Sequence, residues 1–260
     1  MNSRKGILTL SLAASLIIIS SQSQAEIALD NSQTELKFAV INIGEPYEFT
    51  NSSGHIAGIL VEITQLLLAK SNIKANIEIT PYKRMIHELK AGSIDCAMFF
   101  TSQIHSKDFF QLGLIAKKPV IIINSPAQAS AKNLSDFEGR NIGRIRGAHY
   151  GSEFDDNQKI RKSDLNNYQQ GVAQVMKSRI DGFIGAQESI AELYDLSIGY
   201  YTLSSRENWL QCSKTSPRMQ TPEILEKLYS GLQLLHNRDE RLDPISIIHR
   251  KYLQSYTRPL

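Results

Sequence analysis

The chain has 260 residues, of which 42% are hydrophobic and 21% charged, which is an ordinary balance for a folded globular protein. That length allows one large domain or two small ones. The formal net charge of +3 falls close to neutral if residues 1–25 are removed, because these carry two basic side chains and no acidic one. Charge therefore gives no reason to expect binding to nucleic acid or to an anionic membrane.

The N-terminal segment has the parts of a secretory signal peptide. Arg4 and Lys5 make a basic start, residues 7–19 form an apolar run, and Ser23-Gln24-Ala25 places small residues before a cleavage site. The run is too short to span a bilayer comfortably, and no later segment approaches about 18 unbroken apolar residues. We predict a cleaved signal peptide over residues 1–25, rather than an uncleaved anchor, and a soluble periplasmic protein.

The first part of the mature chain alternates strands and helices. Strands are predicted over residues 35–41, 75–79 and 96–100, with a helix over 59–70 between the first two and a second helix after Pro81. Four apolar residues of that second helix recur at helical spacing: Tyr82, Met85, Ile86 and Leu89. Right-handed crossovers turn this β-α-β-α-β order into a parallel sheet. The carboxyl end of the strand at 96–100, next to Thr101, then opens on a binding crevice.

The middle of the chain carries the first crossing between two halves. Residues 102–118 are polar and predicted irregular, and residues 120–123 form a short strand that enters the second half. A strand over 141–145 follows, and Gly147 then leads to a helix near Tyr150. Backbone N–H groups at such a helix start bind anions.

The second half repeats the helix–strand unit of the first. A helix over 170–177, with Val172, Val175 and Met176 facing inward, precedes a strand that begins at Ile180-Asp181, as Ile94-Asp95 begins the earlier one. A helix over 187–194, strands over 198–203 and 209–212, and helices from Pro222 and Pro244 complete the chain. We predict an α/β fold of two lobes, each a mostly parallel sheet with helices on both faces. Lobe 1 comprises residues 26–120 and 213–260, and lobe 2 comprises 121–212.

The two cysteines of the chain, Cys96 and Cys212, both fall in predicted strands. An oxidising compartment permits a disulfide between them, but we favour two separate buried thiols. The spacing of Cys and His residues resembles no zinc site, and we find no nucleophile elbow and no phosphate-binding loop. We therefore expect no metal and no cofactor.

Five segments in order resemble the family 3 periplasmic solute-binding proteins, which serve importers of polar amino acids. They lie at 45–58, 85–95, 134–143, 177–184 and 212–214, and the resemblance covers nearly all of residues 34–256. It implies two lobes joined by two crossings, a ligand held between them, and hinge closure around that ligand. It also implies a monomer that works with an inner-membrane ABC permease or a sensor.

The chain departs from the family pattern where amino acid binders grip their ligand. The resemblance expects an Arg for the ligand carboxylate where Lys107 stands, and Lys lacks the bidentate fork of Arg. It expects an Asp for the ligand ammonium where Ala186 stands, and Gly-Ser-Thr where the chain has Gly147-Ala148-His149. These departures argue against the mode of ligand binding that is standard for amino acid binders of the family.

The predicted ligand-binding residues lie in or next to the loops that meet at the crevice. Aromatic stacking and cationic contacts favour an organic anion, which is aromatic or a modified amino acid, over a standard zwitterionic amino acid. Trp209 and the acids Glu45 and Glu188 are explained as well by packing or solvation. The predicted ligand contacts are Tyr47, Tyr82, Arg84, Thr101, Lys107, Arg146, Gly147, His149 and Gln187.

Two alternatives to a solute-binding protein stay open. One is an enzyme on the same fold, such as a dehydratase of the cyclohexadienyl type, for which Glu45 or Glu188 would be the acid–base residue. The other is a binding protein that has lost its ligand and serves only a protein partner. We favour the binding protein, because no catalytic set of residues is recognisable.

Overall fold

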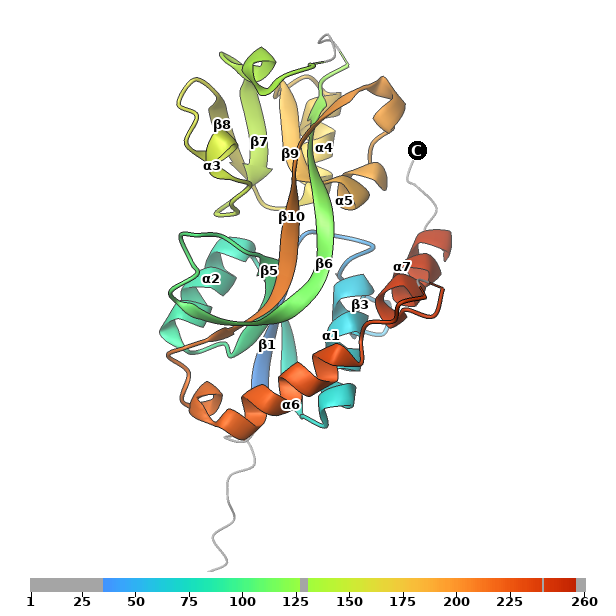
Figure 1. The fold of residues 1–260 in the computed structure, drawn as a ribbon. Helices are drawn as coiled ribbons and strands as arrows, with labels where there is room; N and C mark the ends of the chain where they lie inside the picture. The colour runs from blue at the N-terminus through green and yellow to red at the C-terminus, as the bar shows by residue number, and fades with distance from the viewer. Residues whose placement is uncertain (1–34, 127–130, 240, 256–260) are drawn as a thin grey trace, which may run out of the picture. The chain divides into compact units, whose positions relative to one another are not determined.

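One eight-stranded sheet runs through the part of the chain that the computed structural model describes, which is residues 35–126, 131–239 and 241–255. Its strand order is β4-β1-β5-β10-β6-β9-β7-β8 (Figure 1). The predicted signal peptide lies outside the described residues. Among those residues, no helix combines the length and the apolar character needed to cross a membrane.

Three parallel strands and two helices form the first group. Strand β1 (Leu36–Ile41) pairs in parallel with β4 (Ala75–Thr80) on one side and with β5 (Cys96–Phe100) on the other. Helices α1 (Ile59–Ser71) and α2 (Tyr82–Ala91) make the connections. The four apolar residues predicted for the inner face of α2 are all buried, and Gly92 ends that helix with a φ of 76°. The predicted β-α-β-α-β unit is confirmed.

A second group repeats this arrangement with β7 (Asn141–Ile145) at its centre. Strands β8 (Arg161–Leu165) and β9 (Gly182–Ala186) pair with it in parallel, and helices α4 (Tyr168–Met176) and α5 (Gln187–Ala191) flank β9 in the chain. Strand β8 carries no hydrophobic run, so sequence analysis missed it. The inward position predicted for Met176 is wrong, because Met176 ends its helix and is 49% exposed.

An Asp at the start of β5 and another at the start of β9 make the same backbone contacts. The Asp95 carboxylate accepts a hydrogen bond from the backbone N–H of Lys37 at 2.7 Å, and Asp181 accepts one from Asn141 at 2.7 Å. Each Asp also donates its own N–H to the carbonyl of the same partner, at 2.9 Å in both cases. The Ile-Asp repeat therefore has an architectural role, since each Asp ties the start of its strand to the neighbouring parallel strand.

Two long antiparallel strands, β6 (Phe109–Asn124) and β10 (Tyr200–Ser213), join the groups and lie side by side in Figure 1. Strand β10 pairs with β5 of the first group, and β6 pairs with β9 of the second. The irregular stretch predicted over 102–118 is wrong from Phe109 onward, and the strands predicted over 198–203 and 209–212 are one strand. Polar residues interrupt β6 and β10 where these strands pass from one group to the other. Neither strand therefore shows a continuous apolar pattern in the sequence.

Cys96 and Cys212 form a disulfide, so the prediction of two separate thiols is wrong. The two residues are directly opposite each other on the antiparallel strands β5 and β10. Both side chains are fully buried among the apolar residues under α1. Only the strand register brings them together, and that register joins segments 116 residues apart in the chain.

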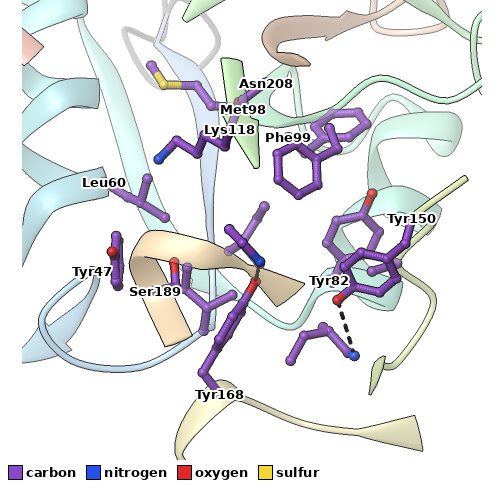
Figure 2. Close-up of a pocket in the computed structure, with 16 residues that line it drawn as sticks. Tyr47, Leu60, Tyr82, Met98, Phe99, Lys118, Tyr150, Tyr168, Ser189 and Asn208 are labelled. Carbon is purple, nitrogen blue, oxygen red and sulfur yellow. Dashed lines mark hydrogen bonds between the residues drawn. The ribbon is translucent and has the colours of Figure 1, made fainter. Parts of the chain in front are cut away.

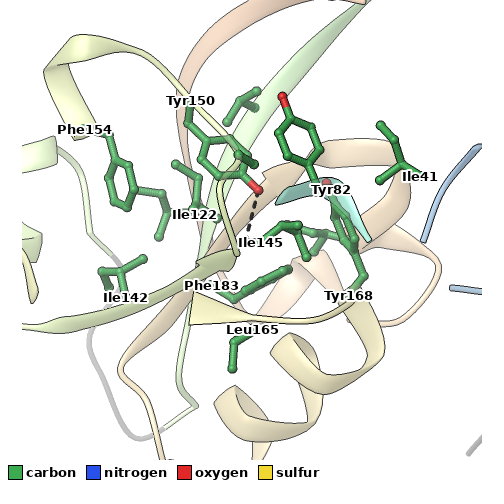
Figure 3. Close-up of a cluster of buried hydrophobic side chains, with 14 of the residues drawn as sticks. Ile41, Tyr82, Ile122, Ile142, Ile145, Tyr150, Phe154, Leu165, Tyr168 and Phe183 are labelled. Carbon is green, nitrogen blue, oxygen red and sulfur yellow. Dashed lines mark hydrogen bonds between the residues drawn. The ribbon is translucent and has the colours of Figure 1, made fainter. Parts of the chain in front are cut away.

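The remaining elements cover the first group and close the loops. Helices α6 (Pro222–Gln233) and α7 (Pro244–Ser255) pack against α1, as predicted from their apolar faces. Figure 3 shows a buried cluster that extends from the second group to Ile41 and Tyr82 of the first, and in which Tyr150, Tyr168 and Phe183 meet aliphatic side chains from the sheet. The short elements are β2 (Phe49–Thr50), β3 (Ile56–Ala57), α3 (Ser152–Asp155), and the 3-10 helices η2 (Leu134–Phe137), η3 (Leu196–Ile198) and η4 (Pro217–Gln220).

Candidate ligand-binding site

A cavity lies between the two groups of strands, where the carboxyl ends of β1, β5, β7 and β9 meet (Figure 2). It contains about 570 Å³ of space free of atoms, including the opening at its mouth. Both groups and both crossing strands contribute to its walls. The lining residues are Ile41, Ile43, Tyr47, Leu60, Tyr82, Met98, Phe99, Phe100, Lys118, Ile145, Ala148, Tyr150, Tyr168, Ala186, Ser189 and Asn208.

Aromatic rings form one end of this cavity. Tyr82, the first residue of α2, meets Phe99 of β5 edge to face, with 6.2 Å between ring centroids. Tyr150, from the loop after β7, lies beside Tyr82 in Figure 2. Such rings offer large, rigid apolar surfaces to a ligand.

Two tyrosine hydroxyl groups in the lining are fixed by the backbone. The Tyr168 oxygen accepts a hydrogen bond from the N–H of Ala186 at 3.0 Å, and the Tyr150 oxygen accepts one from Ile145 at 3.4 Å. Burial raises the pKa of Tyr168 to about 12 and raises the pKa of Tyr150 well above its ordinary value. Both groups therefore stay protonated at neutral pH, and each O–H is still available to donate a hydrogen bond.

A lysine and a glutamate form an ion pair at the other end. Lys118 of β6 lines the cavity with its side chain only 10% exposed, and its amine binds the carboxylate of Glu188, in the first turn of α5. Burial raises the pKa of the Glu188 carboxyl, but Lys118 and His249 outweigh burial and hold that pKa below its ordinary value. Glu188 is therefore ionised at neutral pH and balances the charge of Lys118.

Tyr47 stands at this same end with an unsatisfied hydroxyl group. The residue is 3% exposed, and its hydroxyl has no partner with hydrogen-bond geometry in the described part of the chain, although Ser189 is close by. Burial and the charge of Glu188 raise the pKa of Tyr47, so this hydroxyl keeps its proton. A buried donor without a well-aligned partner is costly, and the side chain of Ser189 is the neighbouring group that lowers the pKa of Tyr47 through a hydrogen bond.

The two sides of the cavity touch each other at its edges. The N–H of Tyr168 donates to the carbonyl of Ile43 at 3.1 Å, and the side-chain amide of Gln169 donates to the carbonyl of Glu45 at 2.9 Å. Gly147, with a φ of +81°, leaves its Cα against Lys83, where a Cβ would come within 3.1 Å of that side chain. Gly147 therefore has the left-handed conformation that favours glycine, at a contact between the two sides.

Of the nine predicted ligand contacts, Tyr47 and Tyr82 line the cavity. Arg84 and Arg146 instead line a second depression on the outside, which we call the outer groove. Arg84 is 69% exposed there and pairs with Glu88 one turn along α2. The outer groove is lined by Pro81, Tyr82, Lys83, Arg84, His87, Ile145, Arg146, Leu165 and Asn166.

Three more predicted contacts do not appear among the lining residues of the cavity. The backbone of Thr101 is tied to β10, since its N–H donates to the Glu207 carbonyl at 3.0 Å. Lys107 is exposed, and its carbonyl accepts a hydrogen bond from Lys214. Gln187 begins α5 and is partly exposed next to the cavity residue Ala186.

The anion site predicted at a helix start near Gly147 and His149 is occupied by a carboxylate of the chain itself. Helix α3 has four residues, and the backbone N–H groups of Tyr150 and Gly151 both donate to Asp155, at 2.9 and 3.1 Å. His149 lies 3.5 Å from the same carboxylate and 5.2 Å, centroid to centroid, from the ring of His105. The backbone N–H groups of Tyr150 and Gly151 are therefore already satisfied within this loop.

Sequence analysis missed most of the residues that line the cavity. Lys118 lies in the stretch predicted to be irregular, and Asn208 lies between the two segments predicted as separate strands. Tyr168 precedes the predicted start of its helix. Predicting one continuous strand over 109–124 would have placed Lys118 two residues before the buried run at 120–124, and so would have identified it as a charged residue next to the core. In the described part of the chain, no group of three or more His, Cys, Asp or Glu side chains is arranged to hold a metal ion.

Two parallel-stranded groups, joined by two crossing strands and enclosing a cavity at their carboxyl ends, define a two-lobed binding protein. The family model for bacterial extracellular solute-binding proteins, family 3, matches residues 36–241, and the chain belongs to this family. The predicted resemblance and fold class are confirmed. None of the curated proteins compared with the chain matches its sequence.

Solved structures with the same fold include binding proteins and a periplasmic domain. A mutant of ArgBP from T. maritima matches with a TM-score of 0.70 at 15% identity, over 86% of this chain and 97% of that one. An ancestral arginine-binding protein bound to glutamine matches with 0.67 at 16% identity, over 84% and 97%. The VFT2 domain of Bordetella pertussis BvgS matches with 0.66 at 15% identity, over 85% and 95%. At these identities the likeness establishes the fold alone.

Proposed function

We propose that this protein captures a small organic molecule in the cavity between its two lobes, as a binding protein rather than an enzyme. The observation that carries the proposal is the cavity itself, whose walls come from both lobes and contain the unsatisfied hydroxyl of Tyr47. Membership of a solute-binding family supports it. The lobes we propose are residues 26–120 with 213–260, and residues 121–212.

The pairing of Glu188 disfavours the enzyme alternative. A general acid in a dehydratase needs a carboxyl whose pKa is raised toward neutrality, whereas Lys118 and His249 hold the pKa of Glu188 low. The other candidate, Glu45, is exposed on its loop and does not line the cavity. These two positions support binding without turnover.

We infer that the protein is exported to the periplasm and works with an inner-membrane ABC permease or a sensor. The basic start and apolar run of residues 1–25 support export, and the extracellular character of the family agrees with it. Mass spectrometry of the periplasmic fraction should find Glu26 at the N-terminus. Intact Met1 in the membrane fraction would contradict export.

A thermal-shift screen tests the binding function. The protein is unfolded to strip any bound ligand, refolded, and screened against a metabolite library. A true ligand should raise the melting temperature in proportion to the logarithm of its concentration above the dissociation constant. The radius of gyration measured by small-angle scattering should then fall at saturation as the lobes close. A library without a single stabilising compound would remove the support for a small-molecule ligand.

A further inference from the structure

The cavity has two ends of different chemistry, and together they restrict the ligand. The aromatic end has Tyr82, Phe99 and Tyr150, backed by Ile41 and Ile145. Because these walls are apolar and planar, they suit a flat apolar group, whose burial and ring contacts stabilise the complex. A long charged side chain placed at this end would lose its hydration against apolar walls.

The polar end is electrically balanced before any ligand arrives. Lys118 is the one charged side chain among the described residues that line the cavity, and Glu188 neutralises it from behind. An anionic ligand head would have to compete with Glu188 for the amine, and an ammonium group would have to compete with Lys118 for the carboxylate. Either competition uncouples a largely buried ion pair, which is unfavourable.

Hydrogen-bonding groups at the lining nevertheless remain unsatisfied. Tyr47 offers a buried O–H, and the side-chain oxygen of Asn208 is buried without a partner in the described part of the chain. The first group needs an acceptor and the second needs a donor. A neutral head, such as a primary amide, forms hydrogen bonds at the polar end without introducing charge.

We propose that the cavity selects an uncharged molecule with a flat, aromatic body and a neutral polar head that both accepts and donates hydrogen bonds. This rests on the proposed function, that the cavity is where the ligand binds. The selection is set by the Lys118–Glu188 pair, which rejects a net charge on the head, and by the buried hydroxyl of Tyr47 at the same end, which favours a head with a hydrogen-bond acceptor.

Four probes with the same phenyl body and different heads test this selection. They are phenylacetamide, which is neutral, phenylacetate, phenethylamine and phenylalanine, which is a zwitterion. Calorimetry with the mature, ligand-stripped protein should give the amide a dissociation constant at least about tenfold below those of the other three. Equal or tighter binding of a charged probe or of phenylalanine overturns the neutral-head rule and leaves the binding function standing.

A change at Glu188 tests the origin of the selection. In Glu188→Gln the new amide oxygen still accepts from Lys118, but the lysine charge is no longer balanced. Preference should therefore move from phenylacetamide to phenylacetate by about tenfold or more. The matched control is Glu45→Gln, which removes an exposed carboxylate outside the cavity and should leave the order of the probes unchanged.

The remaining outcomes distinguish a failure of the proposed ligand selection from a failure of the proposed binding function. If circular dichroism shows that Glu188→Gln does not fold, the four probes on the unchanged protein decide the question alone. If Glu188→Gln folds and keeps the original order, the ion pair does not set the selection and the proposal is wrong. If no probe binds while the metabolite screen finds a ligand, the aromatic preference fails alone. If the screen is also empty, the proposed function fails with it.

Discussion

The cavity and the outer groove share two lining residues, Tyr82 and Ile145, but they differ in chemistry. The cavity is apolar and aromatic with a balanced ion pair, whereas the outer groove is edged by Arg84 and Arg146. The difference arises from local geometry. Tyr82 and Arg84 are two positions apart on α2 and so point to different sides of the helix, and Arg146 directly follows Ile145 at the end of β7, where side chains alternate.

This comparison teaches that being next to a cleft in the sequence does not place a residue in it. All the residues at a strand end lie near the edge of the cavity. The periodicity of the helix or strand then determines which of their side chains point into it. The cations predicted as ligand contacts belong to the outward positions. The following changes test whether the cavity or the outer groove is the binding site, in order of decreasing expected effect.

Filling the cavity should have the largest effect. Ala186 ends β9 and lines the cavity with a methyl group, so Ala186→Phe would occupy space that the ligand needs. We expect affinity for the ligand found in the thermal-shift screen to fall by about 100-fold or more, equivalent to about 2.7 kcal/mol. Calorimetry measures this, with circular dichroism to verify folding. Ala91→Phe, at the exposed end of α2, is the control and should bind normally.

Breaking the ion pair should reduce stability. Lys118→Met leaves Glu188, whose side chain is 35% exposed, without its partner. Removing one member of a fully buried pair costs about 3–5 kcal/mol, and the partial exposure of Glu188 lowers our expectation to roughly 1–3 kcal/mol. Urea titration gives the free energy of unfolding. The double variant Lys118→Met/Glu188→Gln should recover part of the loss, and equal destabilisation of both variants would argue against a coupled pair.

The buried histidine His105 should make stability depend on pH. Burial lowers the pKa of His105, helped by Lys90 and His149 and opposed by Asp108. The folded state therefore holds neutral His105, while the unfolded chain binds a proton as the pH falls below about 6.5. This residue costs nothing above that pH and destabilises the fold progressively below it.

His105→Gln should accordingly flatten the fall in unfolding free energy between pH 7 and pH 5 relative to the unchanged protein. His87→Gln, at an exposed position on α2, provides the matched substitution for comparison. Parallel slopes for the unchanged protein and His105→Gln would show that other groups account for the acid sensitivity.

Removing the outer cations should have the smallest effect. Arg84 is exposed and pairs with Glu88 only at the helix surface, and Arg146 is exposed at the end of its strand. Arg84→Ala and Arg146→Ala should leave the ligand dissociation constant unchanged within the error of calorimetry, because neither residue lines the cavity. A marked loss of affinity in either variant would restore the interpretation drawn from the sequence, in which these cations hold an anion.

The fold was more predictable from the sequence than the site was. Strongly periodic elements such as α2, with four buried apolar residues on one face, identify themselves locally. The crossing strands β6 and β10 do not, because residues such as Lys118 and Asn208 interrupt the apolar pattern where the strands pass the cavity. The Cys96–Cys212 disulfide likewise depends on a strand register that local patterns do not carry.

The site depends on these same non-local features. Tyr82, predicted as a ligand contact, lines the cavity, because it begins a recognisable helix at a recognisable strand end. Lys118 contributes to the cavity because of a long antiparallel pairing, and its charge is neutralised by Glu188, 70 residues away. Interactions of this range cannot be read from spacing.

A crystal structure of the protein with the compound that gives the largest thermal shift tests the assignment of the site most directly. We expect the compound in the cavity, with its flat part against Tyr82 and Phe99 and its polar head beside Tyr47 and Lys118. A compound bound instead in the outer groove, between Arg84 and Arg146, with the cavity empty, would contradict it.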